Sequence, residues 1–343
     1  MHYVLYVLLM LFMFGIMIFL HEFGHFFTAR RFGVAIKEFA VGMGPTLLSW
    51  KSKKYETKYA LRLLPIGGFV SMVGEDEESE DENAFCNKSV WKRMLIVVAG
   101  PVMNLLLGFL LMTVMVFSMG TLASTTVAQF HENATSSAQL QVGDVITHVD
   151  GTRVHTGNEL VYEIMNQGYE PLDIKVVRDG ESLTLHDVTF PGMEESGVSF
   201  GTYDFYVAKE EITLGTLLKH AFWRSVSTVK MVYDSLIGLV TGRFGMETVS
   251  GPVGVVEAVG TAAKSGVWSV IYLVIVLSIN LGVFNLIPFP ALDGGRFLFL
   301  AVEGVRGKPL NRSIESYVNF VGIMILFAFM IFVTVKDVLH LFG

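Results

Sequence analysis

The stretch IMIFLHEFGHFF, residues Ile16–Phe27, decides how this chain folds. It lies inside one of the most apolar segments of the sequence, yet it contains two imidazoles and a carboxylate. Ionisable groups at membrane depth are costly to bury and usually have a function. The stretch therefore predicts a membrane protein whose chemistry takes place inside a span.

The composition of the whole chain also indicates an integral membrane protein. Of its 343 residues, 52% are hydrophobic and only 17% are charged, whereas soluble domains carry about 25% charged residues. The net charge of −7 comes largely from the acidic run Glu75–Glu82, which we expect to be a solvated loop. The sequence has no basic stripe of the kind that would indicate a nucleic-acid partner. The single cysteine, Cys86, excludes an internal disulfide and disfavours a cysteine-ligated zinc site.

Four apolar stretches have the roughly 20 residues that a membrane span needs. They cover residues 3–27, 94–119, 268–286 and 317–335. Basic residues flank the connection between the first two spans and the connection between the last two, which predicts that both connections are cytoplasmic. Both termini and the segment between the second and third spans are then extracytoplasmic. The basic residues are Arg30, Arg31, Lys37, Lys51, Lys53, Lys54, Lys58, Arg62, Lys88, Lys92 and Arg93, then Arg296, Arg306, Lys308 and Arg312.

The segment between the second and third spans contains a small α+β domain at residues 121–205. TTVAQF and GDVITHV predict strands, and Asp179–Gly180 predicts a hairpin between two alternating runs. GNELVYEIMNQG has helical spacing, with Leu160, Ile164 and Met165 expected on one buried face. For residues 206–265 we expect an amphipathic helix on the membrane surface followed by a linker. Charged residues interrupt the apolar pattern of the helix, which favours a surface position over a fifth span.

The polar residues of the opening stretch have the spacing of a metal site. His21 and His25 are four residues apart on one helical face, so both imidazoles can bind one ion, and zinc is the metal this pair suits. Glu22 is rotated away from the pair but is close enough to take a proton from water that the metal activates. Two histidines could instead hold haem, but haem ligation needs no adjacent glutamate, which disfavours that alternative.

A catalytic zinc needs a third protein ligand, and Asp293 is the candidate. It lies in NLGVFNLIPFPALDGGRFLF, after a span broken by Pro288 and Pro290. Broken helices at membrane depth occur where backbone is buried or lines a wet cavity. The residues alone leave two interpretations open: a metal ligand, or an ordinary turn at the membrane surface.

HEFGH in the first span together with NLIPFPALDGG after the third closely resembles the site-2 protease family of intramembrane zinc metalloproteases. GMGP, LPIGGFV, AGPVMN and SGPVG resemble its bacterial branch, the regulator of sigma-E proteases that cleave anti-sigma factors. The resemblance implies a Zn2+ cofactor, with His21, His25 and Asp293 as ligands and Glu22 as the catalytic base. It further implies that four residues bind the substrate, namely Asn285 and, in a membrane-dipping β-region, Gly67, Gly68 and Phe69.

The implied fold is an α-helical polytopic membrane protein with four transmembrane helices, a membrane-associated β-region and an inserted extracytoplasmic PDZ domain. Its parts are the first membrane half at 1–120, the PDZ domain at 121–205, the surface helix and linker at 206–265 and the second membrane half at 266–343. LQVGDVITHVDG resembles the strand entry of circularly permuted bacterial PDZ domains. The resemblance leaves open whether residues 137–140 capture a carboxylate or the domain only blocks access sterically.

The implied function is hydrolysis of peptide bonds within transmembrane segments of single-span proteins. The partners would be pre-trimmed anti-sigma factors or signal-peptide remnants in the bilayer of the bacterial cell membrane. The alternative is a non-proteolytic membrane PDZ binding protein with a structural metal site. A metal transporter is disfavoured because the second and fourth spans offer little polarity beyond Asn104 and Asn319. We expect Asn104 to bond a neighbouring backbone, and the alternative is direct contact with the substrate.

Overall fold

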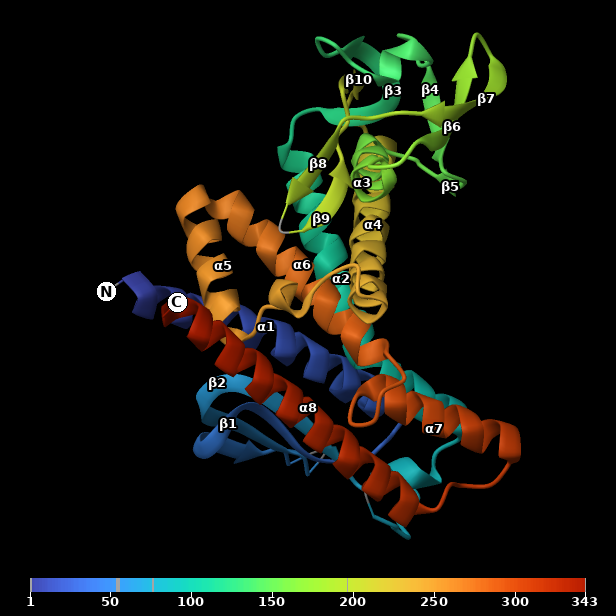
Figure 1. Ribbon diagram of the computed structural model, residues 1–343. Helices are drawn as coiled ribbons and strands as arrows, with labels where there is room; N and C mark the ends of the chain where they lie inside the picture. Colours follow the sequence, from blue (N-terminus) through green and yellow to red (C-terminus); the bar gives the residue numbers. More distant parts are fainter. Residues whose placement is uncertain (1, 54–55, 76, 196, 343) are drawn as a thin grey trace. The chain divides into compact units, whose positions relative to one another are not determined.

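The computed structural model describes residues 2–53, 56–75, 77–195 and 197–342. Lys54 and Asp76, which belong to the charge patterns above, lie outside the described residues. The chain forms two compact units, one made of 1–108 and 247–343 and the other of 109–246. Figure 1 labels their helices and strands.

The first unit is built from long apolar helices, and the prediction of membrane-spanning segments is confirmed. Among the described residues, four helices are long and apolar enough to cross a membrane, at Tyr3–Arg31, Val90–Ser118, Val267–Leu286 and Arg312–Leu339. They belong to α1 (His2–Arg31), α2 (Val90–Ser118), α6 (Val267–Leu286) and α8 (Arg312–Phe342). The shorter helices are α5 (Pro252–Ser265) and α7 (Asp293–Arg306), with single turns η1 (Phe85–Asn87) and η3 (Met246–Thr248).

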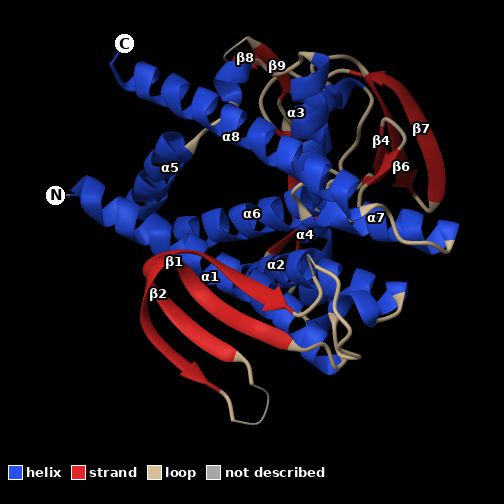
Figure 2. Cartoon of the chain, turned by 90° about the horizontal axis from the view of Figure 1, so that it is seen from below, coloured by secondary structure: helices blue, strands red, loops and turns tan. Residues whose placement is uncertain are grey.

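A long antiparallel hairpin of β1 (Ile36–Lys51) and β2 (Lys58–Met72) lies beside α1, as Figure 2 shows. Its pairing brings Ala40 opposite Phe69, and it bends where Gly42 and Gly67 have positive φ angles. Positive φ is tolerated by glycine because it has no Cβ. Phe26 of α1 and Phe39 of β1 share one buried apolar cluster, which packs the β-region onto the first span.

Helix α5 was missed by the sequence analysis, which expected a linker there. Its N-terminal turn is held by Asp337 of α8, whose Oδ2 accepts hydrogen bonds from the amides of Gly251 and Gly254 at 2.8 and 3.0 Å. A carboxylate is favourable at a helix N-terminus because the free amides there carry partial positive charge. Tyr6 of α1 packs where Gly260 leaves room, so α5 belongs to the helical core of this unit.

The second unit is an α+β fold, as its alternating pattern predicted. Its main sheet is antiparallel, with the strand order β10-β3-β4-β6-β7 and with β5 paired to β4. Strands β8 and β9 form a separate pair. The predicted hairpin at Asp179–Gly180 is confirmed between β6 and β7. The strands are β3 (Leu122–Phe130), β4 (Val145–Val149), β5 (Thr152–Arg153), β6 (Leu172–Arg178), β7 (Glu181–Val188), β8 (Gly192–Glu195), β9 (Val198–Gly201) and β10 (Phe205–Glu210), with a short turn η2 (Ser136–Ala138).

Two helices complete this unit. In α3 (Gly157–Gln167), Leu160 and Ile164 are fully buried, but Met165 is 42% exposed, so its predicted place on the buried face is wrong. One residue beyond Ile164, it is turned by about 100° around the helix. The amphipathic helix α4 (Leu214–Thr241) begins with a capping box between Thr213 and Thr216 and lies against α3.

Side chains on one face of α4 bind α3 directly. The Tyr162 hydroxyl donates to Asp234 at 2.7 Å, and Lys230 pairs with the buried Glu163. His155, just before α3, stacks on Trp223 with ring centroids 3.5 Å apart. This face of the helix therefore packs on protein within its own unit.

A buried ion pair joins the residue before β4 to the end of β6. Asp144, 1% exposed, accepts two 2.7 Å hydrogen bonds from the Arg178 guanidinium and one of 2.8 Å from the Gln141 amide. Burial alone would raise the pKa of the Asp144 carboxyl, but these hydrogen bonds lower the pKa below its ordinary value. The aspartate that suggested a PDZ strand entry thus has a structural partner.

Replacing Arg178→Met should destabilise this unit, because it leaves the Asp144 carboxylate buried without its partner. We expect the free energy of unfolding to fall by about 3 kcal/mol at neutral pH. Since the pKa of Asp144 is lowered in the folded state, the pair stabilises fully above about pH 4 and its contribution disappears as the pH falls below that value. The difference between variant and wild type should therefore shrink in acid.

Hydrogen exchange of β6 peptides in the full-length protein, compared at pH 7 and about pH 3, measures this difference. Lys175→Met, at an exposed position on the same strand, is the matched control and should change little. Equal losses in the two variants would show that the ion pair is not what stabilises the sheet.

Candidate metal centre

Three side chains from distant parts of the chain converge inside the helical unit. His21 Nε2 lies 3.1 Å from Asp293 Oδ2, His25 Nε2 lies 3.4 Å from the same oxygen, and the two imidazole nitrogens are 3.2 Å apart. The two histidines are 9% exposed, and their rings meet edge to face. The structure therefore brings together the three residues that the sequence suggested as a ligand set.

This arrangement fits a zinc ion on geometry and on donor chemistry. Ligand atoms about 2.0–2.1 Å from a tetrahedral centre are separated by about 3.3 Å, which matches the three observed separations. Asp293 Oδ2 is buried and, apart from the two imidazole nitrogens that it faces, has no hydrogen-bond partner among the described residues. A buried anionic oxygen without a partner is costly, and a cation offsets that cost. Two imidazoles and one carboxylate are also a known donor set of catalytic zinc, with a fourth position left for solvent or substrate.

The outer nitrogen of each imidazole contacts α2. His25 Nδ1 lies 2.8 Å from the carbonyl oxygen of Ile96, so it carries a proton and leaves Nε2 free to bind a metal. His21 Nδ1 lies 3.2 Å from the side-chain amide of Asn104, which is 0% exposed. The expectation that Asn104 bonds a neighbouring backbone through its side chain is wrong. Its backbone carbonyl accepts a 2.8 Å hydrogen bond from Ser278 of α6.

Glycines allow α1 and α2 to approach closely at this point. A Cβ on Gly100 would lie 2.2 Å from His25 Nε2 and 2.9 Å from His21 Cε1. A Cβ on Gly24 would lie 2.4 Å from the Ala99 carbonyl oxygen. Real Cβ atoms do not come so near, so only glycine fits at either position. Gly100 therefore has a role beside the histidines that spacing alone did not reveal.

The segment that carries Asp293 is also fixed by close backbone contacts. A Cβ on Gly294 would lie 2.2 Å from the Ile287 carbonyl oxygen, and a Cβ on Gly295 would lie 2.3 Å from that of Phe289. Ala291 has a φ of 73°, and its amide donates to Asn319 Oδ1 of α8 at 3.1 Å. The two glycines after the aspartate let the chain double back, so that α7 begins at the aspartate itself.

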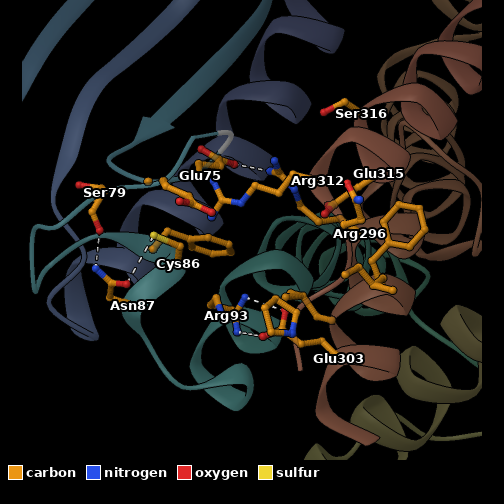
Figure 3. Close-up of a pocket in the computed structure, with 18 of the residues that line it drawn as sticks. Glu75, Ser79, Cys86, Asn87, Arg93, Arg296, Glu303, Arg312, Glu315 and Ser316 are labelled. Atoms are coloured by element: carbon orange, nitrogen blue, oxygen red, sulfur yellow. Dashed lines mark hydrogen bonds and ion pairs between the residues drawn. The ribbon is translucent and has the colours of Figure 1, made fainter. Parts of the chain in front are cut away.

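Two ion pairs anchor α7 beside a polar cavity of about 740 Å³ (Figure 3). Arg93 of α2 binds Glu303 through two hydrogen bonds of 3.0 and 2.5 Å. Arg296 pairs with Glu75, whose other oxygen accepts from the Met72 amide at 3.1 Å. The acidic run was expected to be entirely solvated, but its first residue is 12% exposed at the side chain and helps fix α7. The predicted loop is therefore wrong at that residue.

The base candidate Glu22 lies against the β-region. A Cβ on Gly68 of β2 would lie 3.2 Å from Glu22 Cγ and 3.0 Å from the Ala40 carbonyl oxygen. Within the described residues, no hydrogen bond or ion pair is made by the Glu22 carboxylate. The carboxylate is thus free to bind water or substrate, and the strand passes directly beside it.

The other substrate-binding candidates have varied surroundings. Gly67 is buried with a φ of +81°, and a Cβ there would meet Met43 Cε at 2.7 Å. The Arg62 guanidinium lies 4.8 Å from the centre of the Phe69 ring. Asn285 is half-buried, and its Nδ2 donates to the Leu281 carbonyl of its own helix at 2.9 Å. Of the four candidates, Gly68 is the one for which the close approach to Glu22 is observed.

Comparison with known proteins gives a consistent result. The model of the family described as peptidase family M50 matches residues 9–329. A candidate zinc metalloprotease of Clostridium acetobutylicum is 37% identical over 331 residues, covering 95% of each chain. The regulator of sigma-W protease RasP of Bacillus subtilis is 30% identical, covering 96% of this chain and 97% of its own. The zinc metalloprotease RasP of Shouchella clausii is 30% identical, with 96% and 98% covered.

The family match spans HEFGH, the aspartate segment and the helices that carry them, and it agrees with the zinc-like spacing of the three side chains. The chain therefore belongs to peptidase family M50 and is a membrane zinc metalloprotease of the site-2 type, with Zn2+ as its cofactor.

Proposed function

We propose that His21, His25 and Asp293 bind the catalytic zinc and that Glu22 is the base in hydrolysis of peptide bonds inside transmembrane segments. The observation that carries this proposal is the convergence of the three ligand atoms, 3.1–3.4 Å apart, from segments at opposite ends of the chain. The burial of Asp293 Oδ2, which within the described residues faces the two imidazole nitrogens and makes no hydrogen bond, adds to it. A structural metal would not need the adjacent, unpaired carboxylate of Glu22.

The chain's own residues account for the proton transfers. When bound, zinc acts as a Lewis acid that activates water and polarises a carbonyl oxygen. Glu22 takes a proton from the attacking water and later gives it to the leaving nitrogen. Its position one residue after His21 keeps it next to the ligands, while its side chain points toward β2. The Ile96 carbonyl holds the orientation of His25 throughout.

The hairpin supplies a surface for an extended substrate. A peptide bond inside a helix is covered on all sides, so the substrate must unwind locally before attack. We infer that a substrate segment lies along β2 near Gly67, Gly68 and Phe69, where main-chain hydrogen bonds would hold it extended. Gly68 lies beside Glu22, so a segment held there is within reach of the base. Asn285 is the further candidate for binding the freed backbone groups.

The finer topology and substrate class also belong to the proposal. Basic residues beside the spans support cytoplasmic connections, extracytoplasmic termini and an extracytoplasmic PDZ domain in the bacterial cell membrane. The substrates we propose are single-span proteins already trimmed outside, namely anti-sigma factors or signal-peptide remnants. The name of one relative, regulator of sigma-W protease, supports a link to sigma-factor control.

One observation favours a filtering role for the α+β domain over carboxylate capture. The amides of Ala138, Gln139 and Leu140 already donate to carbonyls within their own turn. The Ser136 amide and hydroxyl donate to Asp204. Few amides in this turn are left for a peptide carboxylate, so we propose that the domain acts mainly as a steric filter.

Glu22→Gln should abolish cleavage while zinc stays bound, because glutamine keeps the size of the side chain but cannot accept the proton. A positioned base contributes about 10²–10⁴-fold, so the loss should be of that order. The assay is cleavage of a panel of single-span reporters in membranes, with product termini mapped by mass spectrometry and zinc measured in the same samples. Retained turnover would favour the alternative, a non-proteolytic membrane binding protein with a structural metal site.

Asp293→Asn should lower zinc content, because an amide is a far weaker zinc ligand than a carboxylate. Zinc is measured by metal analysis of the purified protein after dialysis against a chelator. Glu257→Gln, which removes an exposed carboxylate from α5, is the matched control and should retain zinc. Unchanged zinc in both variants would mean that the third ligand lies elsewhere.

Gly68→Ala should slow cleavage about 10-fold or more without removing zinc, because the new methyl group presses on Glu22 and displaces the base. Gly304→Ala adds a methyl group that meets only a Val90 side chain at an ordinary 3.4 Å, so it serves as the control. The two variants are compared by cleavage rate and zinc content. A Gly68→Ala protein as fast as wild type would remove the β-region from the account of the base.

A further inference from the structure

The buried amide of Asn104 is explained neither by helix packing nor by substrate binding. Its side chain belongs to α2 yet points at His21 Nδ1, 3.2 Å away. The contact to α6 is made by its backbone carbonyl, which accepts from Ser278, and does not use the side chain. A polar side chain with 0% exposure inside a span is costly unless its hydrogen bonds serve a function.

Each of the two imidazoles needs a hydrogen-bond acceptor from α2. A neutral imidazole that binds a metal through Nε2 carries its proton on Nδ1, and that N–H needs an acceptor. For His25 the acceptor is the Ile96 carbonyl oxygen, 2.8 Å away. For His21 the group at the corresponding place is the Asn104 amide.

Only one orientation of that amide suits metal binding. With the amide nitrogen toward the ring, His21 Nδ1 would have to accept, and the proton would move to Nε2 and block the metal position. With Oδ1 toward the ring, Oδ1 accepts from Nδ1–H and Nε2 keeps its lone pair. Among the described residues Oδ1 has no hydrogen-bond partner, so turning the amide replaces only the present contact between Nδ2 and His21 Nδ1.

We propose that Asn104 is a positioning residue of the zinc site, whose Oδ1 accepts a hydrogen bond from His21 Nδ1–H and keeps Nε2 as the metal-binding nitrogen. This inference rests on the proposed ligand role of His21. The site then holds one ligand through a backbone carbonyl and the other through a side-chain amide. The carbonyl cannot be changed by substitution, whereas the amide can.

The test is zinc affinity, measured by chelator competition on the purified full-length protein in detergent. Asn104→Leu keeps the size but removes the acceptor, and we expect affinity to fall about 10–100-fold, the usual effect of losing such a partner. Asn104→Asp restores an acceptor oxygen and should bind zinc at least as tightly as wild type. If Asn104 only packed between helices, zinc affinity would not fall in Asn104→Leu and recover in Asn104→Asp.

Ser278→Ala is the matched control, because it removes the buried hydrogen bond to the backbone of the same residue and leaves the amide intact. It should change zinc affinity by less than about twofold, well below the expected loss for a ligand partner. An equal loss in Ser278→Ala and Asn104→Leu would overturn the proposal in favour of helix packing. Zinc affinity of Asn104→Leu equal to wild type would overturn it as well.

Two further measurements cover misfolding and the ligand assignment. In wild-type protein with 15N-labelled histidine and bound zinc, His21 should show a protonated Nδ1, and an unprotonated Nδ1 would overturn the proposal even if Asn104→Leu does not fold. His21→Ala separates the two hypotheses. If it leaves zinc affinity intact, the proposed ligand set fails; if it loses zinc while Asn104→Leu does not, only the positioning role fails.

Discussion

Burying a carboxylate and two imidazoles among membrane helices costs free energy, and a bound cation can offset that cost. The rest of the helical unit holds the three side chains where one cation can contact them all. All three facing atoms can bind a cation, and one of them, Asp293 Oδ2, makes no hydrogen bond to any other group in the described part of the chain. Without a cation this arrangement would concentrate unpaired polar groups in an apolar region. The neighbouring helices must therefore be placed so that His21, His25 and Asp293 meet at one point.

Three features meet that constraint, and each comes from a different part of the chain. Gly24 and Gly100 let α1 and α2 approach until the α2 backbone lies against the imidazoles. Gly294 and Gly295 let the chain fold back so that α7 starts at the aspartate. The pair of Arg93 with Glu303 then fixes α7 near its end, and the pair of Arg296 with Glu75 fixes it near its start.

Much of this could be predicted from the sequence, because it depends on local patterns. Apolar length gave the four spans, alternation and Asp179–Gly180 gave the β6–β7 hairpin, and the HEFGH spacing gave two side chains on one helical face. The meeting of these histidines with Asp293, 268 residues after His25, is a tertiary fact that spacing alone left open. There the family resemblance, and not the residues, supplied the expectation.

What sequence reasoning missed depends on three-dimensional contacts. Helix α5 has no side-chain N-cap of its own, and its N-terminus is held by Asp337 of α8, which lies 83 residues after Gly254. Glu75 belongs to a run that reads as solvated, yet α7 brings Arg296 to it. Met165 sits close to a buried helical face, but the turn between it and Ile164 exposes it. Asn104 was expected to make a polar contact between packed helices, because the sequence around it does not show that it faces His21.

The placement of Glu22 explains why the hairpin follows the first span directly. A base one residue from a ligand projects from the helix at about 100° to it, so it cannot face the same partners as the ligands. In this chain β2 passes on that side at Gly68. A helix there would bring side chains against the carboxylate, whereas a strand with glycine leaves space and offers main-chain groups to an incoming segment. The short connection from α1 into β1 thus links the chemistry of the helix to a surface suited to an extended chain.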